Sequence, residues 1–426
     1  MGLAAAYEAL VQGHSVTVVE AATDAGGMAA HFDFGGLSIE RFYHFVCQTD
    51  APTFELLAEL GLSEKMRWRP TSMGFFSDGR LYSWGNPVAL LAFPGLDLLS
   101  KLRYGLFLFR CMHQDQWPEL EHLRARDWIT RSCGNAVYER FWHPLLSYKY
   151  YEYADNISAA WIWTRIRRVG KSRRSMMQEE LGYIDGGSQT LVDALLERIH
   201  SLGGVVRLGS PVSRVRSESE RVIGVETDGV FIPADHVIAT APIPLIPNMV
   251  PDLPDAWKER YRAIHNIGVI CMVFKLRRSV SPHFWINISE HGLEIPGIIE
   301  FSNLRPVGND HIVYVPYYMP VTNPKFTWTE EELKEEAFAC LRRLNPELSP
   351  EDVLDVRCAR LKHGQPVCEP GFAAKIPPVQ TPNAGLQVAD TCFYYPEDRG
   401  IAESARLGRQ MARNVPMAIS PRGNRV

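Results

Sequence analysis

The sequence predicts an α/β fold in which two domains are interleaved along the chain. A helix-like segment, Leu3–Val11, is followed at once by a short apolar strand, Ser15–Glu20. Strand segments of the same kind return near residues 205, 237 and 386, and two long stretches separate these groups. The first stretch, about 50–180, shows helical periodicity, with one helix expected near Trp128–Tyr138. The second, about 255–375, alternates short strands with one helix. A helix-and-strand domain interrupted twice by an α+β domain explains this order.

Composition narrows the class of protein. The 426 residues are enough for two domains, and 46% hydrophobic with 22% charged residues is typical of a globular protein. The 45 basic and 49 acidic residues give a net charge of −4 without long runs, which argues against nucleic acid as a partner. We expect a cytoplasmic location and no transmembrane segment, because neither a signal peptide nor a run of 18 apolar residues occurs. None of the eight cysteines has metal-site spacing, so free thiols and no metal are expected.

The opening segment has the pattern of half a dinucleotide-binding unit. Small residues such as Ala4 give the helix a face for close packing, and Gly13 stops it before the strand Ser15–Glu20. Glu20 ends that strand, where an acid accepts hydrogen bonds from the ribose hydroxyls of a bound dinucleotide. The pattern therefore makes Glu20 a candidate ligand of an adenosine ribose.

The other half of such a unit is a strand before the helix and a glycine turn, G-x-G-x-x-G, which lets pyrophosphate rest on the helix N-terminus. Only Gly2 stands in the place of the third glycine. We therefore expect this chain, as it begins at Met1, to lack the central strand of its nucleotide-binding sheet. The expected result is a gap beside the Ser15–Glu20 strand, a weakened pyrophosphate site, and full cofactor occupancy that needs residues outside this chain.

The turn after Glu20 strengthens the interpretation. Gly26 and Gly27 are adjacent, and two glycines permit positive φ and close passage of backbone past a ligand, although a surface turn has the same pattern. Placed after the acid, this turn resembles the second fingerprint, E-x(5)-G-G-(R/K), of the FAD-dependent amine oxidase and phytoene desaturase superfamily. Met28 stands where that fingerprint often has a basic residue.

Three later segments resemble the same superfamily in the same order. Residues 183–195, with the letters Y-I-D-G-G-S-Q-T-L, resemble the stretch that returns the chain to the FAD domain. Residues 204–215 resemble the strand that meets the adenine through backbone atoms, with Val212 at the contact. The third segment ends a strand at Asp390 and passes through Y-P-E-D-R-G to a helix at Gly400 and Ile401. That last turn resembles a subgroup of protoporphyrinogen-oxidase-like and UDP-galactopyranose-mutase-like proteins.

The resemblance implies a Rossmann-like, GR2-type FAD-binding domain made of residues 1–50, 183–250 and 380–415. Residues 51–182 and 251–379 would form an α+β substrate domain with a helical insertion. The implied cofactor is FAD, with Asp390 near the ribityl and pyrophosphate and the following helix beneath the flavin pyrimidine. The implied cofactor-binding residues are Gly2, Glu20, Gly26, Gly27, Met28, Val212, Asp390, Gly400 and Ile401.

The substrate half offers candidates with two interpretations each. Lys149 and Arg165, in the densest aromatic region, would bind an anionic group or, for Lys149, approach the flavin; the neighbouring tryptophans fit plain packing equally well. His44 is a candidate general base or a structural histidine. Residues 93–110 are apolar with interspersed basic residues, which fits a peripheral membrane contact or a substrate gate, but a core helix is the favoured interpretation.

The resemblance implies an FAD-dependent oxidoreductase that removes a hydride from a C–N or C–C bond of a small organic substrate, a hydrophobic one included. One alternative is a mutase-like isomerase in which reduced flavin attacks a nucleotide sugar. The other is a non-catalytic homologue that has lost its cofactor. No residue pattern identifies the substrate.

Overall fold

Short parallel strands form the first of two parts of the molecule, which we call the parallel-strand part. The computed structural model describes residues 1–417. Here β1 (Thr17–Val19) pairs in parallel with β8 (Val205–Arg207), and β12 (Val237–Ala239) pairs in parallel with β18 (Leu386–Val388). Among the described residues no strand joins these two pairs, so the sheet is in two pieces and the second edge of β1 has no strand beside it.

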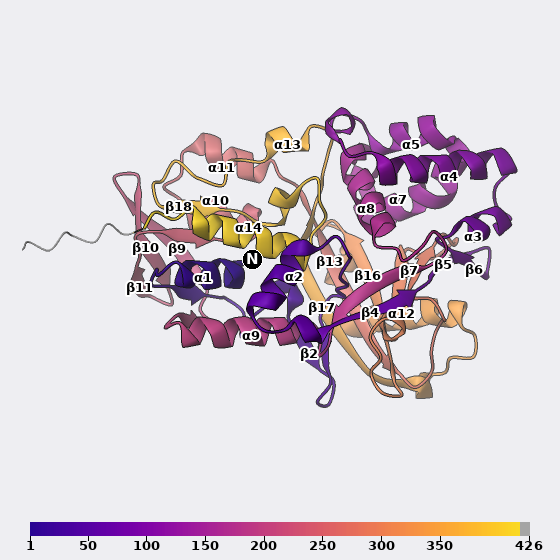
Figure 1. The fold of residues 1–426 in the computed structure, drawn as a ribbon, viewed down its shortest axis with the longest axis horizontal. Coiled ribbons are helices and arrows are strands. Elements are labelled where there is room, and N and C mark those ends of the chain that lie inside the picture. The colour runs from indigo at the N-terminus through magenta and orange to yellow at the C-terminus, as the bar shows by residue number, and fades with distance from the viewer. Residues whose placement is uncertain (418–426) are drawn as a thin grey trace, which may run out of the picture.

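Helices hold the parallel-strand part together. The small residues Ala4 and Ala5 are buried, which lets α1 approach its neighbours closely. At Gly408 an added Cβ would lie 2.5 Å from the carbonyl oxygen of Met1, so only glycine fits this crossing. Around them lie α1 (Gly2–Val11), α2 (Ala51–Glu59), α9 (Ser188–Ser201) and α14 (Ile401–Arg413), at the left of Figure 1.

One predicted boundary differs from the structure. Residues 51–182 are expected in the substrate domain, but α2 packs with the parallel-strand part. Its Leu56 and Leu57 are 1% exposed and share a core cluster with Leu191 of α9 and Ala405 of α14. The apolar face of α2 decides its place, and helical periodicity alone does not reveal which neighbour that face will contact.

Antiparallel strands complete this part. Residues 212–233 form a three-stranded sheet, and two further antiparallel sheets have two strands each. The strands are β9 (Val212–Glu218), β10 (Arg221–Thr227) and β11 (Val230–Pro233), then β2 (His31–Asp33) with β3 (Ser38–Glu40), and β4 (Met66–Thr71) with β7 (Glu179–Ile184).

A seven-stranded sheet is the centre of the second part, in the order β17-β13-β16-β15-β14-β5-β6. The two strands at one end of this sheet, β5 and β6, come from residues 73–84 and the others from residues 266–366, so the chain crosses between the parts more than once. One face packs on the apolar side of α12 (Glu330–Leu344). The strands are β5 (Met73–Ser77), β6 (Arg80–Trp84), β13 (Asn266–Leu276), β14 (Trp285–Ile288), β15 (Gly297–Glu300), β16 (His311–Met319) and β17 (Val353–Pro366).

A helical insertion between β6 and β7 occupies the upper right of Figure 1. Side chains of Asn86, Asp97 and Ser158 accept backbone N–H bonds and start three of its helices. A helix predicted near Trp128–Tyr138 instead ends at Cys133, because Gly134 leaves the helix at φ 93°. The helices are α3 (Pro87–Ala92), α4 (Leu98–His113), α5 (Ala125–Cys133), α6 (Asn135–Val137), α7 (His143–Tyr150) and α8 (Ala159–Lys171).

Short helices α10 (Ile246–Met249), α11 (Asp255–Arg262) and α13 (Phe372–Lys375) lie beside the parallel-strand part in Figure 1. The eight cysteines are free thiols, and all but Cys358 are buried. Of the helices in residues 1–417, none combines the length and the apolar character needed to cross a membrane.

Candidate functional site

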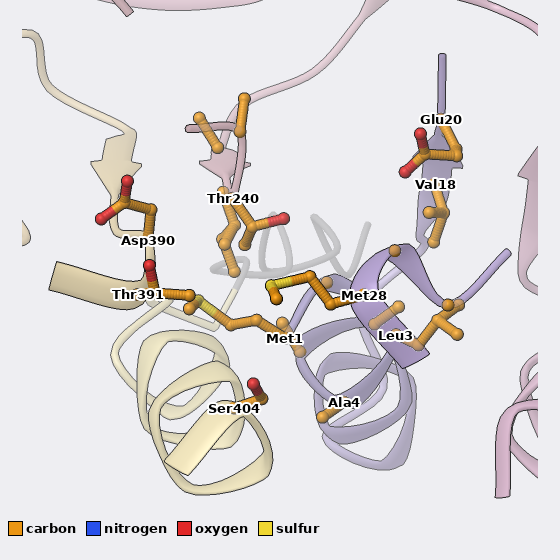
Figure 2. A pocket seen from close by; sticks show the side chains of 18 of the residues that line it. Met1, Leu3, Ala4, Val18, Glu20, Met28, Thr240, Asp390, Thr391 and Ser404 are labelled. Atoms are coloured by element: carbon orange, nitrogen blue, oxygen red, sulfur yellow. The ribbon is translucent and has the colours of Figure 1, made fainter. Parts of the chain in front are cut away.

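One large cavity lies against both parts of the molecule. Its volume is about 2180 Å³, several times what a single small ligand needs. Its lining includes the start of α1 and the strand β1, and also Tyr43, Lys149 and Trp285 of the second part. Figure 2 shows the end of the cavity that lies between α1, β1 and the strand leading to Thr240. The cavity has room for a long ligand together with a second molecule.

Two helix N-termini open onto this cavity. Gly2 begins α1, and an added Cβ there would lie 3.1 Å from the hydroxyl oxygen of Thr240. Gly400 caps α14, which begins at Ile401 and runs for 13 residues. Neither helix end has a side-chain cap, so their first backbone N–H groups stay available to a ligand. Unpaired N–H groups and the positive end of the helix dipole make such a position favourable for an anion.

Glu20 follows β1 at the rim of the cavity. Its backbone N–H bonds the carbonyl oxygen of Arg207 at 2.9 Å, which fixes the end of the strand beside β8. Its Oε1 accepts the backbone N–H of Ala22 at 2.9 Å, while the side chain lies on the β1 side of the cavity in Figure 2. The carboxylate is therefore oriented and keeps further acceptor positions.

The glycine pair has the backbone that the sequence predicts. Gly26 has φ 110° and Gly27 has φ 60°. A Cβ at Gly26 would lie 3.1 Å from the backbone nitrogen of Ala30 and 3.2 Å from a methyl group of Val192. Glycine at position 26 is thus required by conformation and by space. Met28 follows, and its side chain reaches into the cavity in Figure 2.

All nine residues predicted to bind a cofactor line this single cavity. Val212, the first residue of β9, lies in the same wall as Pro211 and Val215. The nine are Gly2, Glu20, Gly26, Gly27, Met28, Val212, Asp390, Gly400 and Ile401.

Asp390 has its oxygens occupied by backbone groups. It is 7% exposed, its Oδ2 accepts the N–H of Ile243 and its Oδ1 accepts the N–H of Cys392, each at 2.8 Å. Burial raises the pKa of Asp390, against the effect of these hydrogen bonds. The side chain ties the end of β18 to the turn after β12 and so shapes the cavity wall.

Lys149 lines the cavity and stands in a cage of aromatic rings. The residue is 6% exposed, and its Nζ lies 4.8 Å from the ring centre of Tyr318, 5.0 Å from Trp161 and 5.7 Å from Tyr150. Burial, and then the charge of Arg165, lower the pKa of Lys149 well below its usual range. The amine is therefore shifted toward the neutral form and faces the cavity.

Arg165 already has an anionic partner within the protein. It forms an ion pair with Asp398, and its guanidinium lies 4.7 Å from the ring centre of Trp161. Burial opposes ionisation of Asp398, but Arg165 and the other nearby cations together outweigh burial and lower the pKa of that carboxyl. Arg165 therefore already has a counter-charge in Asp398, and its binding of an anionic ligand group stays a prediction.

Sequence reasoning missed two residues near Arg165. Asp398 and Arg399 lie in the Y-P-E-D-R-G turn, of which only Gly400, with Ile401 after it, was selected. Arg399 donates to the Tyr318 hydroxyl at 3.1 Å and to the carbonyl oxygen of Gly364. The signal was an acid–base pair directly before a glycine that starts a cavity-facing helix.

His44 also lines the cavity, with a neutral ring. Burial is the main cause that lowers the pKa of His44, and no other group within residues 1–417 hydrogen-bonds its buried Nδ1. A neutral imidazole with an unpaired nitrogen is able to accept a proton. Within the described residues no cluster of three or more His, Cys, Asp or Glu has an arrangement that would hold a metal ion.

The low pKa of Lys149 predicts a pH-dependent stability difference. Between its lowered folded-state pKa and the ordinary value of 10.5, the unfolded chain binds more protons at Lys149 than the folded chain does. Wild-type stability therefore rises with pH across this window, relative to a variant without the amine. We expect K149M to be more stable than wild type at neutral pH, with the difference narrowing as pH approaches 10.5.

Urea unfolding at about pH 7 and about pH 9.5 measures this difference. Lys334, exposed on α12 and paired with Glu331, supplies the control K334M, which should change little at either pH. A difference between K149M and wild type that stays constant with pH would show that Lys149 is charged in the folded protein.

Comparison with known proteins identifies the family. The sequence profile described as flavin containing amine oxidoreductase matches residues 2–365. The chain belongs to the flavin-containing amine oxidoreductase family. One relative with a similar sequence is the 15-cis-phytoene desaturase of an Oncidium hybrid cultivar. It is 24% identical over 279 residues, which are 61% of this chain and 47% of the desaturase. The chain spans about half the length of the curated relatives it matches.

Solved structures share the fold of this flavin-containing amine oxidoreductase family member. A protein assigned as a protoporphyrinogen oxidase from Exiguobacterium sp. 255-15 has a TM-score of 0.71 at 18% identity, covering 96% of this chain and 95% of the other. A reduced UDP-galactopyranose mutase has a TM-score of 0.72 at 15% identity, covering 96% of this chain and 92% of the mutase. At such identities these likenesses establish the α/β fold alone.

Proposed function

We propose that this chain is an FAD-dependent oxidoreductase that removes a hydride from a C–N or C–C bond of a small organic substrate. The observation that carries the proposal is that one cavity collects the nine predicted cofactor residues together with Lys149, Arg165 and His44. Membership of a family of flavin oxidoreductases supports the same reaction class.

The residues present fit FAD. The unpaired N–H groups at the start of α1, with Gly2, would hold the pyrophosphate, and Glu20 would accept bonds from the ribose hydroxyls. Val212 would meet the adenine, and the start of α14 at Gly400 would lie near the flavin ring. At Gly26 the absence of a Cβ lets the turn pack against Ala30 and Val192, which holds this part of the cavity wall in place. When bound, FAD supplies the hydride acceptor.

The chain's own residues bind the substrate and handle its proton. Lys149 Nζ, held between three rings and shifted toward the neutral amine, would accept a proton from a substrate C–H, N–H or N–H₃⁺ group. The ion pair of Arg165 with Asp398 fixes the wall beside it. The aromatic ring of Tyr318, which lines the cavity, would exclude water and favour an apolar or cationic substrate.

Reconstitution with FAD tests the proposal. Purified protein titrated with FAD is expected to gain a bound flavin absorption band. Under anaerobic conditions, a panel of primary alkylamines, cycloalkylamines and partly saturated polyenes is then screened for bleaching of that band. Absence of FAD uptake would contradict the proposal and favour the cofactor-deficient homologue.

A separate experiment tests the mutase alternative. Chemically reduced, FAD-loaded protein is incubated with UDP-galactopyranose without an electron acceptor. Conversion of the sugar ring under these conditions, together with no bleaching by any member of the panel, would favour the isomerase reaction over hydride removal.

A further inference from the structure

Helices α3 and α4 expose an unusual concentration of large apolar side chains. Of the 19 large hydrophobic residues exposed in the described chain, seven fall between residues 88 and 109. Each of the seven is at least 49% exposed. They form the α3–α4 face, which is made of Val88, Leu91, Leu98, Leu99, Leu102, Leu106 and Phe109.

The face follows from the helical geometry of α4. Tyr104, Phe107 and Cys111 point into the protein core and are at most 5% exposed. A helix turns roughly 100° per residue, so Leu98, Leu102, Leu106 and Phe109 share the opposite, outward side. The favoured interpretation of residues 93–110 as a core helix is therefore correct for one side of α4 and wrong for the other.

The two helices hold this face as one rigid surface. Lys101 donates from Nζ to the carbonyl oxygen of Leu91 at 2.7 Å, which joins the end of α3 to the first turn of α4. Asp97 caps α4 by accepting the N–H and the hydroxyl of Ser100, at 2.9 and 2.6 Å. The surface lies at the end of the molecule away from α1, at the right of Figure 1, and is convex like any helix side.

Basic residues border the face and acids do not. The sequence of α4 contains Lys101, Arg103 and Arg110 and no Asp or Glu, and α3 has no charged residue. Arg103 and Arg110 are exposed and lie next to the apolar sector on the helix surface. The acids that flank α4 are engaged: Asp97 in its cap and Asp115 in a 2.6 Å ion pair with Arg167.

We propose that the α3–α4 face docks onto an anionic lipid membrane surface. Leucine and phenylalanine side chains enter the boundary between headgroups and acyl chains, while Arg103 and Arg110 meet the lipid phosphates. A convex apolar side bordered by cations fits a fluid, negatively charged surface. A second copy of this chain fits less well, because a two-fold contact through this face would bring the same arginines toward one another.

Vesicle sedimentation tests the proposal, with the purified full chain and no requirement for bound flavin. Binding to phosphatidylcholine vesicles that contain about a quarter phosphatidylglycerol should be on the order of tenfold tighter than to phosphatidylcholine alone. The variant L102S/L106S should bind the anionic vesicles on the order of tenfold more weakly than wild type. The variant R103Q/R110Q should lose the preference for anionic vesicles while it keeps the apolar side chains.

The matched control is V230S/F231S on β11, which removes two equally exposed apolar residues elsewhere, at 53% and 45% exposure. It should bind vesicles like wild type, and all variants should keep the wild-type circular dichroism spectrum. Equal binding by L102S/L106S and V230S/F231S, or no binding of wild type to either vesicle, would overturn the proposal. Light scattering that shows a wild-type dimer dissolved by L102S/L106S, without vesicle binding, would instead assign the face to a second copy.

Discussion

Replacing Glu40 by glutamine is expected to lower the free energy of unfolding by about 3–5 kcal/mol. Glu40 Oε2 lies 3.1 Å from Arg305 Nη1, and the two side chains are 4% and 8% exposed. Glu40 Oε1 also accepts the backbone N–H of Ser188 at 2.8 Å, at the start of α9. E40Q keeps the shape and a hydrogen-bond acceptor but leaves the guanidinium of Arg305 buried without a counter-charge.

The large effect comes from burial, and a surface pair provides the comparison. Glu259 and Arg262 form an ion pair with side chains 68% and 52% exposed, so E259Q should change stability by less than about 1 kcal/mol. The double variant E40Q/R305M, which removes both charges, should recover part of the loss. Denaturant unfolding measures all three, and equal stability of E40Q and E259Q would show that the Glu40 site is hydrated.

Replacing Lys149 by methionine is expected to slow flavin reduction by about 10²–10⁴-fold, the usual contribution of a positioned acid or base. The expectation depends on the proposed reaction and is measured by anaerobic bleaching with the best substrate of the panel. FAD uptake should not change, because Lys149 is not among the residues proposed to hold the nucleotide.

Lys325 is the matched control for this prediction. It is also buried, at 8% exposure, with its Nζ 5.0 Å from the ring centre of Trp328. It pairs with Glu294 and Glu336, however, and does not line the cavity. K325M should reduce flavin at the wild-type rate. If K149M also reduced flavin at the wild-type rate and with the same dependence on pH, Lys149 would be a packing residue.

The parts of the site that sequence reasoning predicted are those set by local chemistry. Gly26 has positive φ, α1 begins at Gly2, Gly400 caps α14, and the acid Glu20 directly follows β1. Each of these features depends on a few neighbouring residues. The order of the motifs along the chain then brought them to one cavity, since helix starts and strand ends meet at the same edge of such a sheet.

The parts that were missed depend on contacts between distant segments. Arg165 and Asp398 are 233 residues apart, so their ion pair could not be read from the sequence. The buried pair of Glu40 with Arg305 spans 265 residues. The helix boundary at Cys133 differs for another reason, since the glycine after it was present in the sequence and its stop signal went unused.

The division of the parallel strands into two separate pairs has a mechanical consequence. In a continuous sheet, the spacing of the strands would fix the width of the crevice above them. Here no strand of the described residues joins the two pairs, and α1 contacts α14 where Gly408 brings the two backbones together. A ligand that contacts both β1 and β12 would therefore connect the two strand pairs. Its binding in the cavity would stabilise the folded protein as well as supply the reactive group.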